Sequence, residues 1–102
     1  MKHSIVYITT DSEKEAEKIA KLLLRRRLIA CANIFPCKSF FWWNNRIAKQ
    51  KEFILICKTE NSKLSRIREE VKKAHNYEIP CISAIGFYPN KEYGQWLEKQ
   101  LK

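Results

Sequence analysis

Four large aromatic side chains in succession, Phe40-Phe41-Trp42-Trp43, most strongly constrain how this chain can fold. They lie at the end of an extended run and are followed by Asn44-Asn45. Because successive side chains of a strand point to opposite faces, two of the four must point away from whatever the other two contact. An exposed aromatic surface of that size is typical of a partner interface or of a ligand platform. The remaining sequence has to distinguish between these two uses.

The aromatic run belongs to a hairpin that is too long for the rest of the domain. Residues 28–43 and 46–59 are the two expected strands, and Asn44-Asn45 tolerates the positive φ of a tight turn. Each strand would span on the order of 45 Å, whereas a helix of about 16 residues spans only ~24 Å, which leaves an overhang of roughly 20 Å. A bare two-stranded ribbon is marginal in water. We therefore expect other copies of the chain to cover Phe40, Phe41 and Trp42.

Local sequence signals predict where the first half of the chain forms regular structure. Residues 4–10 are rich in β-branched side chains and favour a strand. Ser12 and Glu15 have the spacing of a capping box, which marks the start of a helix. Apolar residues then follow the spacing of an amphipathic helix, at Ala16, Ile19, Ala20, Leu23 and Leu24. Pro36, inside the expected strand of residues 28–43, cannot donate a ladder hydrogen bond and so predicts a bulge or an edge strand.

The second half of the chain repeats the strand and helix alternation. A second helix is expected to be capped by Asn61 or Ser62 and to end near His75-Asn76, with Asn76 suited to a left-handed cap. Residues 81–88 favour a fourth strand, and Asn90 precedes a final short helix. The order β-α-β-β-α-β-α predicts an α+β fold, a ferredoxin-like βαββαβ sandwich with a long central hairpin and an extra C-terminal helix. We expect residues 1–102 to form a single domain.

Composition narrows the functional class. No apolar run reaches the roughly 18 residues of a membrane span, and the first residues lack a signal-peptide pattern, so we expect a soluble cytosolic protein without a membrane partner. The net charge of +9 favours binding to an anionic partner such as nucleic acid. RNA recognition is nevertheless disfavoured, because stacking aromatics are expected on the third strand and residues 46–57 carry only Phe53. No nucleophile or carboxylate pair has catalytic spacing, so we expect no enzyme.

The four cysteines, at positions 31, 37, 57 and 81, could bind a soft metal ion. No pair of these cysteines has the C-x-x-C spacing of a zinc ribbon or a redox dithiol. Thiolates favour ions such as Cu(I), although a buried thiol more often packs as a small apolar group. Cys31 lies between two alanines, and Cys81 follows a proline, where exposure is favoured.

Several segments, in order along nearly the whole chain, resemble the CutA divalent-cation tolerance family. Arg27-Leu-Ile-Ala-Cys-Ala-Asn-Ile34 resembles that family's "RLAACVNI" segment, and Ser39-Phe-Phe-Trp-Trp-Asn-Asn-Arg-Ile47 its "S-x-Y-x-W-x-G-x-I" hairpin, with Asn45 in place of Gly. Glu52 followed by Lys58-Thr59 is similar to "E…KT", and His75-Asn-Tyr-Glu-Ile-Pro80 to "HPYEVP". Tyr93 and Trp96-Leu97 match the terminal "Y…WL". The chain is identified as a member of this family.

The resemblance implies a homotrimer similar to PII signalling proteins, associated with divalent-cation tolerance and copper binding. It implies no obligatory cofactor. It also implies a cleft between subunits, whose lining would be Trp43, Glu52, Lys58, Tyr77 and Glu78. A PII-like module that binds a small anionic ligand in this cleft is the alternative function.

Two departures from the family pattern affect the expected metal site. A Cys that some members carry in the first strand is absent, and Cys81 stands where "HPYEVP" is usually followed by Glu. The first change weakens an inherited copper site, and the second supplies a soft ligand beside the cleft. The candidate metal ligands are Cys31, Cys81 and His75.

Overall fold

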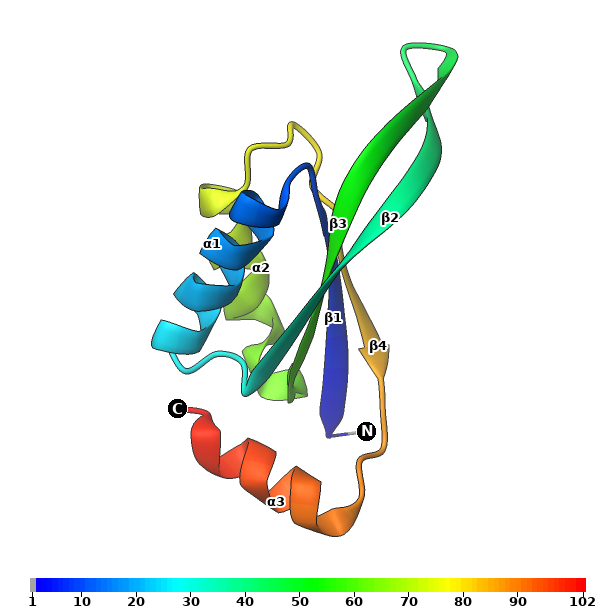
Figure 1. Cartoon of the computed structure of the whole chain (residues 1–102). Coiled ribbons are helices and arrows are strands. Elements are labelled where there is room, and N and C mark those ends of the chain that lie inside the picture. Colours follow the sequence, from blue (N-terminus) through cyan, green and yellow to red (C-terminus); the bar gives the residue numbers. More distant parts are fainter. Residues whose placement is uncertain (1) are drawn as a thin grey trace.

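The computed structural model describes residues 2–102 as an antiparallel sheet with two helices on one face (Figure 1). The strand order in the sheet is β2-β3-β1-β4. The strands are β1 (His3–Thr10), β2 (Cys31–Trp43), β3 (Arg46–Glu60) and β4 (Ile82–Gly86). The helices are α1 (Glu13–Arg25), the short 3-10 helix η1 (Asn61–Lys63), α2 (Leu64–Ala74) and α3 (Lys91–Gln100). This order confirms the predicted ferredoxin-like fold with its additional C-terminal helix.

The core lies between one face of the sheet and the helices α1 and α2. Every second residue of β1 is buried, as expected for a strand with one covered face. From α1, Ile19 and Leu23 have no exposed surface, and from α2 Ile67 and Val71 meet them in the same cluster. Each such side chain contributes about 1.5–3 kcal/mol when fully buried. Leu24, predicted on the same stripe, is 39% exposed, because it lies at the edge of the buried face near the end of the helix.

The strand β2 begins at Cys31, so the prediction of a strand from residue 28 was wrong. Arg27 has a φ of 58°, in the left-handed region that often follows the end of a helix. The Leu28 N–H then donates to the Leu23 carbonyl at 3.0 Å, which closes the C-terminus of α1. Leu28 and Ile29 are consequently buried in the core before the strand starts.

Pro36 lies in a regular part of the β2–β3 ladder, opposite Phe53. The register runs without interruption from Cys31 opposite Lys58 to Trp43 opposite Arg46. No bulge is needed, because β2 is the outer strand of the sheet and the missing N–H of a proline has no cost at an edge. Of the two predicted alternatives, the edge strand is correct.

The hairpin of β2 and β3 extends well beyond the other strands, as predicted. β1 ends where Thr10 pairs with Phe53, so the ladder from Cys37 opposite Glu52 to the turn has no third strand. At ~3.3 Å per residue this two-stranded part is about 20 Å long. Asn44 and Asn45 have φ values of 52° and 61°, the positive values that a tight hairpin turn requires. Figure 1 shows the hairpin projecting beyond both packed helices.

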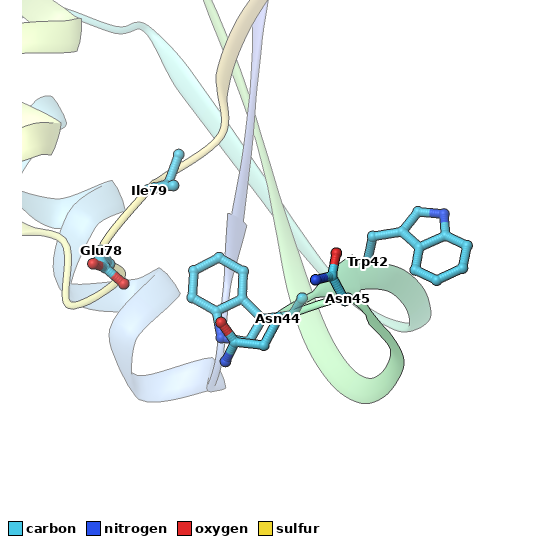
Figure 2. A pocket seen from close by; sticks show the side chains of 6 residues that line it. Trp42, Asn44, Asn45, Glu78 and Ile79 are labelled. Atoms are coloured by element: carbon cyan, nitrogen blue, oxygen red, sulfur yellow. The ribbon is translucent and has the colours of Figure 1, made fainter.

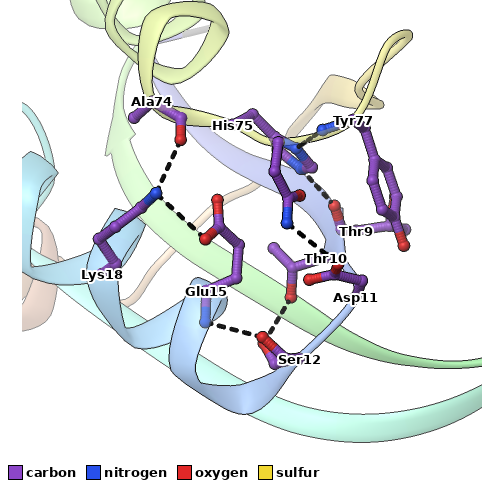
Figure 3. A network of polar contacts seen from close by, with 10 residues as sticks. Thr9, Thr10, Asp11, Ser12, Glu15, Lys18, Ala74, His75 and Tyr77 are labelled. Atoms are coloured by element: carbon purple, nitrogen blue, oxygen red, sulfur yellow. Dashed lines mark hydrogen bonds and ion pairs between the residues drawn. The ribbon is translucent and has the colours of Figure 1, made fainter.

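The capping prediction for α1 is confirmed in part. The Ser12 Oγ accepts a hydrogen bond from the Glu15 N–H at 3.1 Å. The return contact of a capping box does not form, because the Glu15 carboxylate instead pairs with Lys18, 3.1 Å from its Nζ (Figure 3). The Lys18 Nζ also donates to the carbonyl of Ala74 at 2.9 Å, so it links α1 to the end of α2.

The ends of α2 and β4 differ from the prediction. The helix α2 follows η1 directly and has no side-chain cap, so neither Asn61 nor Ser62 caps it. Asn61 instead accepts a hydrogen bond from the hydroxyl of Ser4, a contact across the fold that local sequence does not reveal. The helix ends at an extended His75 rather than at a left-handed Asn76. The pairing of β4 with β1 covers only residues 82–86 and not the predicted 81–88.

Candidate functional site

A hollow of about 610 Å³ lies between the overhanging hairpin and the segment of residues 77–81 that leads into β4. Aromatic and acidic side chains dominate its wall. The lining residues are Thr9, Ser39, Phe40, Phe41, Trp42, Trp43, Ala48, Gln50, Glu52, Tyr77, Glu78, Ile79 and Cys81. A second hollow of about 500 Å³ adjoins it at the hairpin turn, and Glu78 and Ile79 line both. Figure 2 shows Trp42 pointing away from the segment that carries Glu78 and Ile79.

Glu52 and Tyr77 form the polar centre of this hollow. Glu52 is only 6% exposed, and its Oε2 accepts a hydrogen bond from the Tyr77 hydroxyl at 2.6 Å. The Tyr77 hydroxyl in turn accepts from the Gln50 Nε2 at 3.1 Å. Burial, together with the hydrogen bond to Glu52, raises the pKa of Tyr77 well above its ordinary value. The phenol therefore remains a donor throughout the physiological pH range.

His75 holds the segment of residues 75–81 against the end of β1 (Figure 3). Its Nδ1 accepts a hydrogen bond from the Tyr77 N–H at 3.0 Å, so its ring proton is on Nε2. The Nε2–H donates to the carbonyl of Thr9 at 2.7 Å. The Asn76 side chain adds a hydrogen bond to Asp11 at 3.0 Å. These contacts place Tyr77 opposite Glu52.

Four of the five predicted cleft residues line the hollow together: Trp43, Glu52, Tyr77 and Glu78. Lys58 does not, although it shares a face of β3 with Glu52 as predicted. It lies near the other end of the sheet, opposite Ile5, and its Nζ is 3.4 Å from the Tyr93 hydroxyl and 5.1 Å from the centre of that ring. The lining of the hollow contains two carboxylates and no Lys or Arg, which gives the anionic-ligand alternative no support within one chain.

The three predicted metal ligands do not come together within one chain. Cys31 begins β2 and Cys81 immediately precedes β4, so the two intervening strands separate them. Both ring nitrogens of His75 already have backbone partners. Among residues 2–102, no three His, Cys, Asp or Glu side chains are grouped closely enough to hold a metal ion. A site that uses both thiols would need a second chain.

The three residues predicted to form a subunit interface are accessible to differing degrees. Phe40 is 63% exposed and Trp42 is 72% exposed, whereas Phe41 between them is half-buried. This difference follows the alternation of side chains along the strand.

Sequence reasoning missed Gln50 and Ile79 as members of the site. Gln50 lies two residues before Glu52 on β3 and therefore on the same face, which was a usable signal. Ile79 is 73% exposed, and nothing in its local sequence pointed to the hollow. Its position follows from the segment of residues 77–81 lying beside the overhanging hairpin, where both line the hollow.

Neither the fold nor the relatives test the expected cytosolic location. Within residues 2–102, every helix is too short or too polar to cross a lipid bilayer. One solved relative from Archaeoglobus fulgidus is named as periplasmic. The cytosolic location stays a prediction.

Comparison with known proteins gives a consistent result. A family model described as CutA1 divalent ion tolerance protein matches residues 4–100. The divalent-cation tolerance protein CutA of A. fulgidus is 46% identical over 101 residues, which cover 98% of this chain and 99% of that protein. Its solved structure matches with a TM-score of 0.96 over 98% of this chain and 99% of that chain.

CutA1 from Pyrococcus horikoshii matches with a TM-score of 0.94 at 37% identity, over 97% of this chain and 98% of that one. The names of these relatives describe tolerance to divalent cations and no reaction. The chain belongs to the CutA1 divalent ion tolerance family.

Proposed function

We propose that this protein acts in divalent-cation tolerance as a homotrimer that binds the metal ion, with copper as the candidate ion. The observation that carries the proposal is the match to the CutA1 family over residues 4–100, together with relatives named for cation tolerance. The chain's own geometry adds two supporting features, an uncovered aromatic hairpin and accessible thiols.

The hairpin supports self-association. Its two-stranded part exposes Phe40, Trp42 and also Ile47, which is 67% exposed. Full burial of a large apolar side chain contributes about 1.5–3 kcal/mol, so covering these three favours association strongly. In a head-to-tail arrangement each copy extends its overhang over one neighbour and receives the overhang of the other, and contacts of this kind close into a ring.

The thiols support a metal site shared between chains. Cys31 and Cys81 lie at opposite outer strands of the sheet, and both are partly exposed. In a cyclic assembly each copy presents one surface to one neighbour and a different surface to the other, and we expect the β2 edge of one copy to meet the β4 edge of the next. Two thiolates from different chains would then supply the soft ligands that copper prefers. His75 is left out of this site, because it has no free nitrogen.

Sedimentation velocity and an anaerobic copper titration, with ascorbate present, test the proposal. We expect a trimer, and we expect Cys31→Ser and Cys81→Ser each to lower copper affinity at least tenfold. The matched control is Cys37→Ser, which removes another partly buried thiol outside the proposed set. A monomer in sedimentation, or copper affinity unchanged in both variants, would contradict the proposal.

A further inference from the structure

We propose that the hollow lined by Glu52, Tyr77 and Trp43 binds a small organic cation, with an alkylammonium group held by the carboxylate against the aromatic rings. This ligand class differs from the metal ion of the proposed function. The two sites share one lining residue, Cys81, but the cation is proposed to contact Glu52, Tyr77 and Trp43, and copper is proposed to bind the thiols. The two proposals are tested with different probes and different variants, so the failure of one can be told from the failure of the other.

The first argument is that Glu52 is a buried carboxylate without a cationic partner. The side chain is 6% exposed, and its one hydrogen bond within the described residues is to the neutral phenol of Tyr77. Among residues 2–102, the ion pairs within 4.0 Å all involve other acids. Buried charges in proteins are normally paired, because desolvating an isolated charge is costly. The missing partner of Glu52 is a positive charge from outside the chain.

The lysines of β3 are engaged elsewhere. Lys49, three residues before Glu52, has its Nζ 5.9 Å from the centre of the Phe40 ring. Lys51 follows the opposite face of the strand, and its Nζ lies 5.7 Å from the centre of the Phe53 ring. Lys58 contacts Tyr93 near the other end of the sheet. Glu78, a second carboxylate in the lining, adds to the negative potential of the hollow. Because the hollow is lined by acids and by no base, it favours a cationic ligand.

The second argument is that the walls suit an organic cation better than a metal ion. The rings of Phe41, Trp43 and Tyr77 all line the hollow, and the faces of such rings attract ammonium groups. Ca²⁺ and Mg²⁺ would need about six oxygen ligands, far more than two carboxylates provide. A cavity of about 610 Å³ lies in the usual size range of small-molecule sites. Trp43 is not among the side chains that we expect other copies to cover, and it is 45% exposed in the single chain.

Isothermal titration calorimetry on the full chain tests this proposal, with tetramethylammonium chloride as the probe. Neopentyl alcohol, a neutral molecule of similar size, is the control for shape, and potassium chloride is the control for charge. We expect tetramethylammonium to bind at least tenfold more tightly than either control. Glu52→Gln keeps an acceptor for Tyr77 but removes the charge, and it should weaken binding at least tenfold. Trp43→Leu should do the same by removing a ring.

Glu69→Gln is the matched control, because it removes one negative charge from an exposed position of α2. It should leave binding unchanged. Equal affinities for tetramethylammonium and neopentyl alcohol would overturn the proposal, and so would an unaltered affinity in Glu52→Gln. If a Lys or Arg of a neighbouring copy is the true partner of Glu52, this variant should weaken the assembly in sedimentation while the wild type binds no probe, which also refutes the proposal. Trp43→Leu, at a side chain 45% exposed, provides a test even if Glu52→Gln fails to fold.

Discussion

His75→Ala is the substitution that best separates a structural from a metal-binding role at this site. His75 is 9% exposed and makes two hydrogen bonds to backbone groups. Its Nδ1 accepts from the Tyr77 N–H at 3.0 Å, and its Nε2–H donates to the Thr9 carbonyl at 2.7 Å. The imidazole thus ties the segment before β4 to the end of β1. Alanine removes both bonds and leaves a backbone donor and a backbone acceptor without partners.

The expected loss can be worked out from these two contacts. A typical hydrogen bond contributes about 1 kcal/mol net, and a buried group left without a partner costs about 1–3 kcal/mol. Partial hydration of the exposed loop reduces the penalty, so we expect the free energy of unfolding to fall by about 2–4 kcal/mol. This is a large share of the 5–15 kcal/mol that is typical of a domain. Copper affinity should not change, because neither ring nitrogen is free.

Urea denaturation, at one fixed protein concentration, measures the stability change. The concentration must be fixed because the apparent stability of an oligomer depends on it. The matched control is His3→Ala, whose ring is partly buried and pairs with the Glu98 side chain at 2.9 Å but holds no backbone group, so it should cost less than His75→Ala. A loss below about 0.5 kcal/mol in His75→Ala would refute the structural role. A tenfold fall in its copper affinity would show that His75 is a ligand after all.

Three further outcomes are expected. Tyr77→Phe removes the donor that Glu52 has among residues 2–102 and should lower the free energy of unfolding by about 1.5–3 kcal/mol in urea denaturation, whereas an unchanged value would mean that water replaces the phenol. Burial raises the pKa of Cys57 to about 12 from 9.0, so its contribution to stability is complete below about pH 9 and is lost as the pH rises through 12. Alkaline denaturation should therefore be less steep in Cys57→Ala. Asn45→Gly relieves a φ of 61° and should raise the melting temperature, while Asn45→Val should lower it.

The hairpin shows which structural features could be predicted from local sequence. Its two strands, its turn at Asn44-Asn45 and its overhang were all predictable, because strand length and turn chemistry are local properties. Whether Pro36 marked a bulge or an edge was not predictable from its own neighbourhood. That choice depended on β2 being the outermost strand, and only the order of strands in the sheet decides it.

The candidate site shows which contacts could not be predicted from local sequence. Periodicity placed Glu52 and Lys58 on one face of a strand, and the structure confirms that face. It did not reveal that the hollow lies at the Glu52 end of this face. Lys58, about 20 Å further along the strand at ~3.3 Å per residue, therefore lies outside it. Nor did it reveal that the Thr9 carbonyl and the Tyr77 N–H occupy both nitrogens of His75.

The sequence by itself determined the order of helices and strands, the amphipathic face of α1 and the long hairpin. Each of these follows from residue spacing or from the backbone preference of a few neighbouring residues. The tertiary structure alone decided that Arg27 turns the chain so that Leu28 and Ile29 fill the core. It also decided that Tyr77 meets Glu52 across 25 positions of sequence. Such contacts arise because folding brings distant segments within about 3 Å, and no local pattern encodes which polar groups will then be paired.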